Sequence, residues 1–337
     1  MRNRRRFGIA FAAAVSAFFV ALATGQAQES RFFRIATGGQ SGTYFPVGLL
    51  IAQAISDMPA GPNCAEPRCG VPGLVGVAQI SNGSVANMAA LQAREVEAAL
   101  VQADVAHWAF EAKEIYQGKP RHDRVRFLAN LYPEAMHVVA RRQSGIDTLA
   151  ALKGRKVALD EPGSGTLIHA RNLLTAYSLR EADLQGVYVK ADLAVPQLIE
   201  GRLDAFFMVA GWPAKPVLDA LASGHARLLP IDVDPAAGPL KSNPFLTKGE
   251  IPAHAYAGIP AVPSLMVRAQ LVARADLPDD LVEAVLTALW SERGQSILRR
   301  GHPRAADIRF EAALEGRSLP LHPGADRFYR DRGLRPD

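Results

Sequence analysis

Short apolar runs rich in β-branched residues alternate along the chain with longer segments whose apolar residues recur at helical spacing. In the first pair, an apolar run occupies residues 32–35 and a helical pattern follows through residues 47–55. The alternation continues along most of the sequence. Strands that alternate with helices predict α/β layers with largely parallel sheets.

The first α/β run is interrupted by a second one, and two helical segments come last. The simplest arrangement is two lobes joined by two crossing strands, near residues 135–142 and 258–268. The first lobe would then be completed by the C-terminal helices. The expected boundaries are residues 28–137 plus 262–337 for lobe 1 and residues 138–261 for lobe 2.

Two local patterns give further expectations. Residues 126–131 and 136–141 have the composition of consecutive strands, and Pro133 between them predicts a turn. The segment from Leu319 onward is rich in proline and charge, which is typical of a surface extension.

The N-terminus has the pattern of an export signal. Arg2 and Arg4–Arg6 precede an apolar, uncharged stretch at residues 8–23, and small residues at 25–27 predict cleavage after Ala27. A membrane anchor is the alternative, but the apolar stretch is shorter than the ~20 residues that span a bilayer. The arginines also fit a twin-arginine signal, although we favour the general secretory route. We therefore expect a signal peptide at residues 1–27 and a periplasmic location.

The charge balance argues against nucleic-acid binding. The whole chain has 38 basic and 33 acidic residues, a net charge of +5. The predicted signal holds four arginines and no acid, so the remainder has 38 − 4 = 34 basic residues against 33 acidic ones. The basic excess therefore belongs largely to the signal.

The two cysteines, Cys64 and Cys69, lie in a loop rich in proline and glycine. An exported protein meets an oxidising compartment, which favours a disulfide between them. No histidine lies near the pair, so the sequence predicts no metal site there.

Four loops share one chemical character, and each follows a predicted strand and opens a predicted helix. They are residues 38–44, 81–84, 102–104 and 163–166. Such loops gather at the carboxyl edge of an α/β sheet, where ligands bind. Backbone N–H groups, hydroxyls and helix N-termini suit a small carboxylate or similar anion. Each loop taken alone is also compatible with simple helix capping.

Sequence motifs for catalysis are missing. The chain has no G-x-S-x-G, H-E-x-x-H or G-x-x-x-x-G-K-[ST] pattern and no G-x-G-x-x-G dinucleotide turn. We expect a protein with no catalytic residues and no cofactor. An exported hydrolase that uses Ser41 or Ser164 remains a competing hypothesis.

Five spaced motifs resemble those of a known family. They are Ala36-Thr37-Gly38-Gly39-x-x-Gly42-Thr43-Tyr44-Phe45-Pro46-Val47-Gly48, Ser81-x-Gly83-Ser84-Val85-x-Asn87, Val101-Gln102-x-Asp104-Val105, Pro162-Gly163-Ser164-Gly165-Thr166 and Phe206-Phe207-Met208-Val209-x-Gly211-Trp212-Pro213. In this order they resemble the signature of the TAXI-type solute receptors of TRAP transporters. The resemblance covers roughly residues 32–300. Phe45 and Trp212-Pro213 depart from the family's usual Tyr and His-Pro.

The resemblance implies a type II periplasmic binding-protein fold, a sodium-coupled membrane partner, and ligands such as glutamate, related amino acids or dicarboxylates. It also implies a pocket lined by Gly39, Ser41, Thr43, Tyr44, Ser84, Asn87 and Gln102 from one lobe and by Ser164, Gly165 and Thr166 from the other. From its place after a strand, Trp212 is a further candidate for a cleft wall, with a core position as the alternative. Asp104 is either a helix cap or a ligand contact.

The favoured function is a periplasmic receptor, acting as a monomer, that captures a small carboxylate or amino acid between two lobes. It would deliver the ligand to the membrane subunits of a TRAP transporter. The alternative is an exported sensory module that presents its ligand to a membrane kinase.

Overall fold

The computed structural model describes residues 30–59, 68–234 and 238–335. The expected signal peptide at residues 1–27 lies outside these ranges. So does Cys64, and the disulfide between Cys64 and Cys69 therefore stays a prediction.

Strands and helices alternate as the hydrophobic pattern predicts. The strands of the described chain are β1 (Arg31–Ala36), β2 (Met58–Pro59), β3 (Arg68–Cys69), β4 (Leu74–Gln79), β5 (Ala98–Gln102), β6 (Val125–Arg141), β7 (Lys156–Ala158), β8 (Gln185–Val187), β9 (Ala205–Ala210), β10 (Ala226–Leu228), β11 (Thr247–Ile251) and β12 (Val262–Arg274). The α-helices are α2 (Tyr44–Ile55), α3 (Ser84–Gln92), α4 (Ala103–Glu111), α5 (Gly165–Ala176), α6 (Ala191–Ile199), α7 (Lys215–Ala222), α8 (Asp279–Trp290), α9 (Glu292–Gly301) and α10 (Pro323–Asp331).

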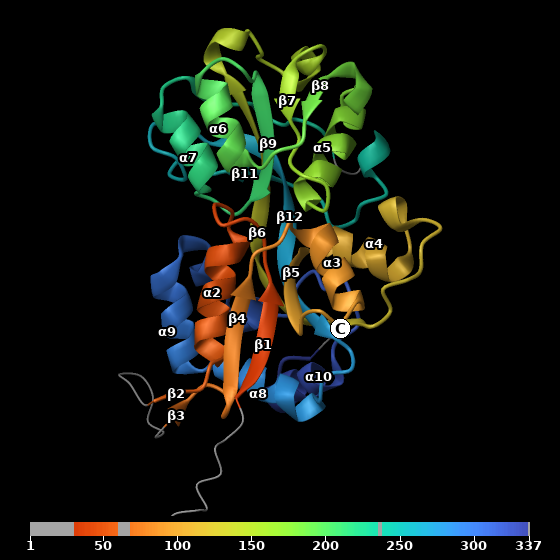
Figure 1. Ribbon diagram of the computed structural model, residues 1–337, viewed down its shortest axis with the longest axis vertical. Helices are drawn as coiled ribbons and strands as arrows, with labels where there is room; N and C mark the ends of the chain where they lie inside the picture. The colour runs from red at the N-terminus through yellow and green to blue at the C-terminus, as the bar shows by residue number, and fades with distance from the viewer. Residues whose placement is uncertain (1–29, 60–67, 235–237, 336–337) are drawn as a thin grey trace, which may run out of the picture. The chain divides into compact units, whose positions relative to one another are not determined.

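Most of these strands form one continuous sheet, in the order β4-β1-β5-β12-β6-β9-β7-β8 (Figure 1). In this sheet β1 pairs with β5 in parallel, and β7 pairs in parallel with both β8 and β9. The β4-β1-β5 part is called the first lobe below, and the β9-β7-β8 part the second lobe.

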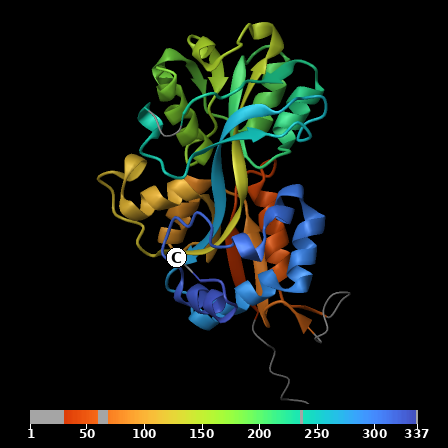
Figure 2. The same cartoon turned by 180° about the vertical axis from the view of Figure 1, so that it is seen from behind.

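The two long strands β6 and β12 run through both lobes and pair with each other in antiparallel fashion, as Figure 2 shows from behind. Toward the first lobe β12 pairs with β5, and toward the second lobe β6 pairs with β9. The prediction of a two-lobe α/β fold with two crossing strands is therefore confirmed.

Each lobe buries apolar side chains on both faces of its part of the sheet, because successive residues of a strand point to opposite faces. In the first lobe, Ile35 packs toward α2, α8 and α10, whereas the next residue, Ala36, packs toward α3 and α4. In the second lobe, Phe207 packs toward α5, and Phe206 packs toward α6 and α7. This layering leaves the helix starts at the edge of the sheet where the two lobes meet.

The predicted turn at Pro133 is wrong. Residues 125–141 form the single strand β6, and Pro133 pairs with Arg268 of β12. Pairing of β6 with β9 begins only at Ala135. Pro133 thus has one strand neighbour in the described sheet, a position where proline's missing N–H is tolerated.

The predicted surface extension from Leu319 is also wrong. Helix α10 lies in this segment and buries Phe328 and Tyr329 completely against the first lobe. The Tyr329 hydroxyl donates a hydrogen bond to the carbonyl oxygen of Leu128, at 2.9 Å. Two large buried rings outweigh the polar composition of the segment.

Candidate functional site

Five helices of the described chain begin at one cavity: α2, α3, α4, α5 and α6. The first residue or the N-cap residue of each lines it. The cavity has a volume of about 80 Å³, enough for several water molecules or one small ligand. A helix start presents unpaired N–H groups and the positive end of the helix dipole. Five such starts therefore make the cavity attractive to negative charge.

Most of the residues expected in the pocket line this cavity. They are Gly39, Ser41, Thr43, Tyr44, Ser84 and Gln102 from the first lobe and Ser164, Gly165 and Thr166 from the second. The cavity therefore lies between the lobes. Asn87 and Trp212 do not line it. The lining also includes Asn82, from one of the four predicted loops, and Glu134, Asp160 and Lys190, which the sequence did not single out.

Thr43 links the two lobes beside the cavity. Its Oγ1 donates a buried hydrogen bond to the carbonyl oxygen of Gly211, at 3.1 Å. Gly211 follows β9 and is tightly packed, since a Cβ there would lie 2.5 Å from Cγ of Arg304 and 3.2 Å from Cγ2 of Thr43. Thr43 is therefore both a wall of the cavity and an interlobe contact.

The start of α5 is held by its own hydroxyls. Ser164 is the N-cap: its Oγ accepts from the N–H of Leu167 at 3.2 Å and donates to Oδ2 of Asp160 at 2.9 Å. Thr166 Oγ1 accepts from the N–H of Val209 at 3.1 Å, which fixes the helix against β9. The Ser164 hydroxyl thus uses its donor and one acceptor position to shape the start of α5.

Gly165 and Gln102 meet across the two lobes. A Cβ on Gly165 would lie 1.7 Å from Oε1 of Gln102, so only glycine allows this contact. Gln102 is buried, and its Oε1 has no hydrogen-bond partner in the described structure. A buried acceptor without a partner costs free energy, and it is available to a ligand that can donate.

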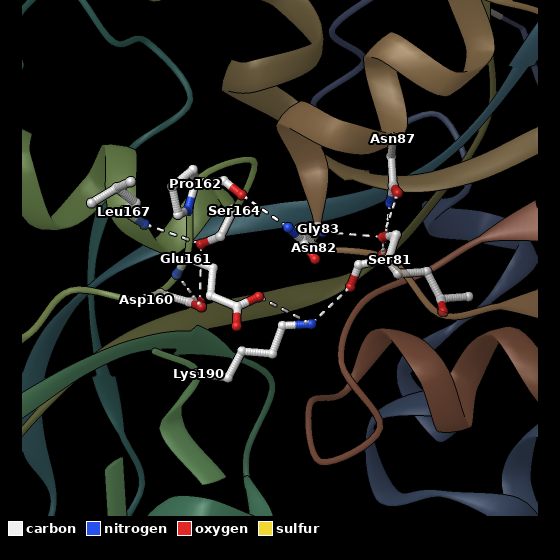
Figure 3. A network of polar contacts seen from close by, with 11 residues as sticks. Ser81, Asn82, Gly83, Asn87, Asp160, Glu161, Pro162, Ser164, Leu167 and Lys190 are labelled. Carbon is white, nitrogen blue, oxygen red and sulfur yellow. Dashed lines mark hydrogen bonds and ion pairs between the residues drawn. The ribbon is translucent and has the colours of Figure 1, made fainter. Parts of the chain in front are cut away.

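A polar network joins the lobes at the rim of the cavity (Figure 3). Lys190 of the second lobe extends between Glu161 and Ser81; its Nζ lies 3.7 Å from Oε2 of Glu161 and donates to the carbonyl oxygen of Ser81 at 3.2 Å. Asn82 donates from Nδ2 to the carbonyl oxygen of Pro162 at 3.1 Å. Contacts of this kind are available only while the lobes are together.

Asn87 has a structural role instead of lining the pocket. Its Nδ2 donates to the carbonyl oxygens of Thr37, at 2.6 Å, and Leu100, at 2.7 Å, and its Oδ1 accepts from the Ser81 hydroxyl at 2.6 Å. Asn87 thus links β1, β5 and the loop before α3. It is nearly one helical turn beyond Ser84, below the cavity-facing end of α3.

Trp212 does not line the cavity either. Its ring is stacked by the guanidinium of Arg304, at 4.5 Å from the ring centroid, and it packs in the second-lobe core with Ala214 and Val217. Arg304 comes from the short 3-10 helix Pro303–Asp307 after α9. A cation–π contact of this kind ties the C-terminal segment to the end of β9.

Glu134 is the most informative residue that the sequence did not reveal. It lies on β6, lines the cavity and is 1% exposed, and its Oε2 accepts a hydrogen bond from the Tyr44 hydroxyl at 2.9 Å. Burial raises the pKa of Glu134 to about 8, although the Tyr44 bond acts in the opposite direction. The sequence feature that could have pointed to Glu134 is a charged residue within a long, otherwise largely apolar strand segment.

Asp160 is a second carboxyl group at the cavity. It has φ of +73°, in the left-handed region, and its Oδ1 accepts from the N–H of Glu161 at 2.7 Å. Burial raises the pKa of Asp160, opposed by hydrogen bonds from Glu161, Ser164 and Thr166. Its acceptors are engaged in shaping the loop before α5.

Asp104 does not line the cavity and forms a buried polar cluster. Asn243 donates from Nδ2 to Oδ2 of Asp104 at 2.6 Å, and Nε2 of His169 lies 3.3 Å from the same oxygen.

Among the described residues, no group of three or more His, Cys, Asp or Glu side chains is arranged to hold a metal ion. Nor does any helix in the described ranges have the length and apolarity needed to cross a bilayer.

Comparisons with known proteins agree with this architecture. A model described as the NMT1-like family matches residues 35–333. PhnD1 of Prochlorococcus marinus (MIT 9301), solved in complex with methylphosphonate, is similar with a TM-score of 0.53 and 9% identity, over 90% of this chain and 98% of that one. A protein of Bordetella bronchiseptica RB50 has a TM-score of 0.50 and 17% identity, over 92% of this chain and 84% of that one. The chain has the two-lobe fold of periplasmic solute-binding proteins.

Proposed function

The chain belongs to the NMT1-like family, and from this membership and the geometry of its cavity we propose that it is a periplasmic receptor for a small carboxylate or amino acid. The ligand is held between the two lobes and delivered to a TRAP-type membrane transporter. The observation that carries the proposal is the convergence of five helix starts on one small cavity.

The helix starts supply the attraction for a carboxylate. Each contributes about 0.3–1 kcal/mol toward a nearby negative charge, and more where water is excluded. Ser and Thr hydroxyls on the wall add hydrogen bonds. A micromolar dissociation constant corresponds to about −8 kcal/mol, which these contacts are sufficient to supply.

The two lobes provide the means of signalling that the site is occupied. We propose residues 28–137 plus 262–337 and residues 138–261 as the two moving bodies, with β6 and β12 between them. Ligand contacts from Thr43 on one side and Thr166 on the other favour the closed form, because only that form offers both. The membrane partner then recognises the closed form.

The choice of a TRAP transporter as partner rests on the five motifs of TAXI character. All five supply lining residues of the cavity, including Gly39, Ser84 and Gln102 from the first lobe and Ser164 and Met208 from the second. The predicted N-terminal signal supports the proposal, because export to the periplasm would bring the receptor to a sodium-coupled transporter.

Ligand binding is tested by thermal shift with purified mature protein against amino acids, mono- and dicarboxylates and methylphosphonate. A specific ligand raises Tm because it binds only the folded state. A hit is then measured by calorimetry. If no member of the panel shifts Tm and the protein carries no co-purified ligand, the proposed function is wrong.

Delivery is tested in vesicles that hold TRAP membrane subunits and a sodium gradient. Uptake of the radiolabelled ligand only when the receptor is added supports the transporter role. Ligand-dependent phosphorylation of a membrane kinase, with no uptake, would instead support the sensory alternative.

A further inference from the structure

Building on the proposed function, we propose that Glu134 and Gln102 form a subsite for an ammonium group, so that the receptor takes α-amino acids in preference to acids without the amino group. The helix starts then hold the carboxylate end of the same ligand. The cavity is thus matched to a zwitterion.

The positions of the two residues support a shared subsite. Gln102 ends β5, and Glu134 lies on β6, with β12 between them in the sheet. Ala269 of β12 pairs with Gln102 on one side and with Tyr132 on the other, two residues before Glu134. Both side chains line the cavity from the same end of the sheet.

Both side chains have acceptor capacity left. Oε1 of Gln102 is buried without a hydrogen-bond partner in the described structure. Glu134 accepts one hydrogen bond, from Tyr44, although a carboxylate has room for several. A ligand that only accepts hydrogen bonds would leave these positions unused, whereas an ammonium group carries three donors.

The charged groups around Glu134 also support an ammonium subsite. Within the described chain, no Lys, Arg or His forms an ion pair with Glu134, and the cavity's own cation, Lys190, is directed to Glu161 and Ser81. The ionisable groups that interact with Glu134 are Tyr44, Tyr132 and Asp104, and none of them carries positive charge. An ammonium ion from the ligand would supply the missing partner.

Binding of an ammonium group at this subsite is coupled to the release of a proton. With a pKa of about 8, Glu134 in the empty cavity holds its proton at pH 7. When a ligand ammonium ion arrives, the carboxyl group ionises, the ammonium pairs with the carboxylate, and the proton leaves to solvent. Roughly 0.9 proton is released per ligand at pH 7. An acid without an amino group releases none from Glu134.

The test uses three matched pairs of probes: glutamate and glutarate, aspartate and succinate, leucine and 4-methylpentanoate. Calorimetry in two buffers of different ionisation enthalpy gives both the dissociation constant and the number of protons released. We expect the better member of at least one pair to be the amino acid, by about tenfold or more, with release of about one proton at pH 7.

Glu134→Gln tests the residue, because glutamine still accepts the Tyr44 hydrogen bond but cannot ionise. The variant should lose about tenfold in affinity for the amino acid, abolish proton release and leave the affinity for the matching acid within about threefold. Glu250→Gln, at an exposed position on β11, is the matched control. If the variant does not fold, the number of protons that the unmodified protein releases on binding the amino acid still tests whether Glu134 ionises.

The outcomes separate the two proposals. If no amino acid binds more tightly than its matched acid, or if amino-acid binding to the unmodified protein releases no proton, the ammonium subsite is overturned and the carboxylate receptor stands. Failure of all six probes and of the wider ligand panel overturns the receptor proposal, and the subsite with it.

Discussion

Oδ2 of Asp104 lies 3.3 Å from Nε2 of His169, and both side chains are almost completely buried. Asp104 is the second residue of α4 in the first lobe, and His169 lies on α5 of the second. Asn243, in the loop before β11, completes the cluster. The pair therefore links the two lobes, and removing it should lower the free energy of unfolding of the whole protein.

Asp104→Asn should lower the free energy of unfolding at pH 7 by about 3 kcal/mol, because it removes the carboxylate from a buried polar cluster that is built around it. Burial alone would raise the pKa of Asp104, but His169 and the hydrogen bonds from Asn243 and Val105 outweigh it and lower the pKa. A lowered folded-state pKa stabilises the protein above the unfolded value of about 3.9, and this stabilisation is lost as pH falls through the folded-state pKa. Urea unfolding between pH 7 and pH 3 should show the variant and the parent converging at acid pH.

The control for this series is Asp219→Asn, at an exposed pair with Lys215 on α7. It should change stability by less than about 0.5 kcal/mol. A constant difference between Asp104→Asn and the parent at every pH would show that ionisation of Asp104 is not involved.

Glu134→Gln should stabilise the unliganded protein at alkaline pH. Burial raises the pKa of Glu134 from its usual value near 4.5 to about 8. The unfolded chain therefore loses this proton before the folded one does, and the parent loses stability as pH rises from 4.5 to 8. Glutamine avoids this loss, so the variant should exceed the parent by about 4 kcal/mol at pH 8 and match it near pH 4.5. Parallel stability curves across this range would contradict the assignment.

Thr43→Val keeps the shape of the side chain and removes the donor to Gly211. It leaves the carbonyl oxygen of Gly211 without this bond in the closed form, so the affinity for the ligand should fall by about tenfold. Thr43→Ser retains the hydroxyl and should bind within a few-fold of the parent. Calorimetry measures both, and unchanged affinity in Thr43→Val would show that the interlobe bond does not contribute to closure.

Gly165→Ala should weaken ligand binding by about tenfold or more without unfolding the protein. The new methyl group would lie 1.7 Å from Oε1 of Gln102, so Gln102 must move or the lobes must separate. Accommodating it costs about 1–3 kcal/mol, which appears as at least about a tenfold loss of affinity. Gly186→Ala, whose Cβ would make ordinary contacts at 3.5 Å or more on β8, is the control. Adding Gln102→Ala to Gly165→Ala should restore the packing. If neither Gly165→Ala nor the double variant folds, this explanation is contradicted.

The sequence predicted the parts of the site that are local. A Gly-rich turn between a strand and a helix is encoded within about ten neighbouring residues, which is why the loops before α2, α3 and α5 were found. The two-lobe order of strands was also visible, because each lobe has its own alternation of strand and helix patterns.

Glu134 and Lys190 were not predicted because their roles depend on distant parts of the chain. Whether a side chain on β6 faces a cavity or a covering helix depends on which strands lie beside it. Lys190 matters through contacts with Ser81 and Glu161, at sequence separations that no local pattern encodes. Asn87 shows the opposite error, since a polar residue close to a binding loop was instead needed to satisfy backbone carbonyl groups.

The five helix starts have a consequence for how such a receptor changes over evolutionary time. Their positive charge belongs to the main chain, so no single side-chain substitution removes it. Substitution of the cavity-lining side chains on β5 and β6, Gln102 and Glu134, would change which ligands fit. The attraction of the cavity for an acid group would be kept. Specificity and affinity for charge are thereby encoded in different parts of the molecule, and they can be inherited separately.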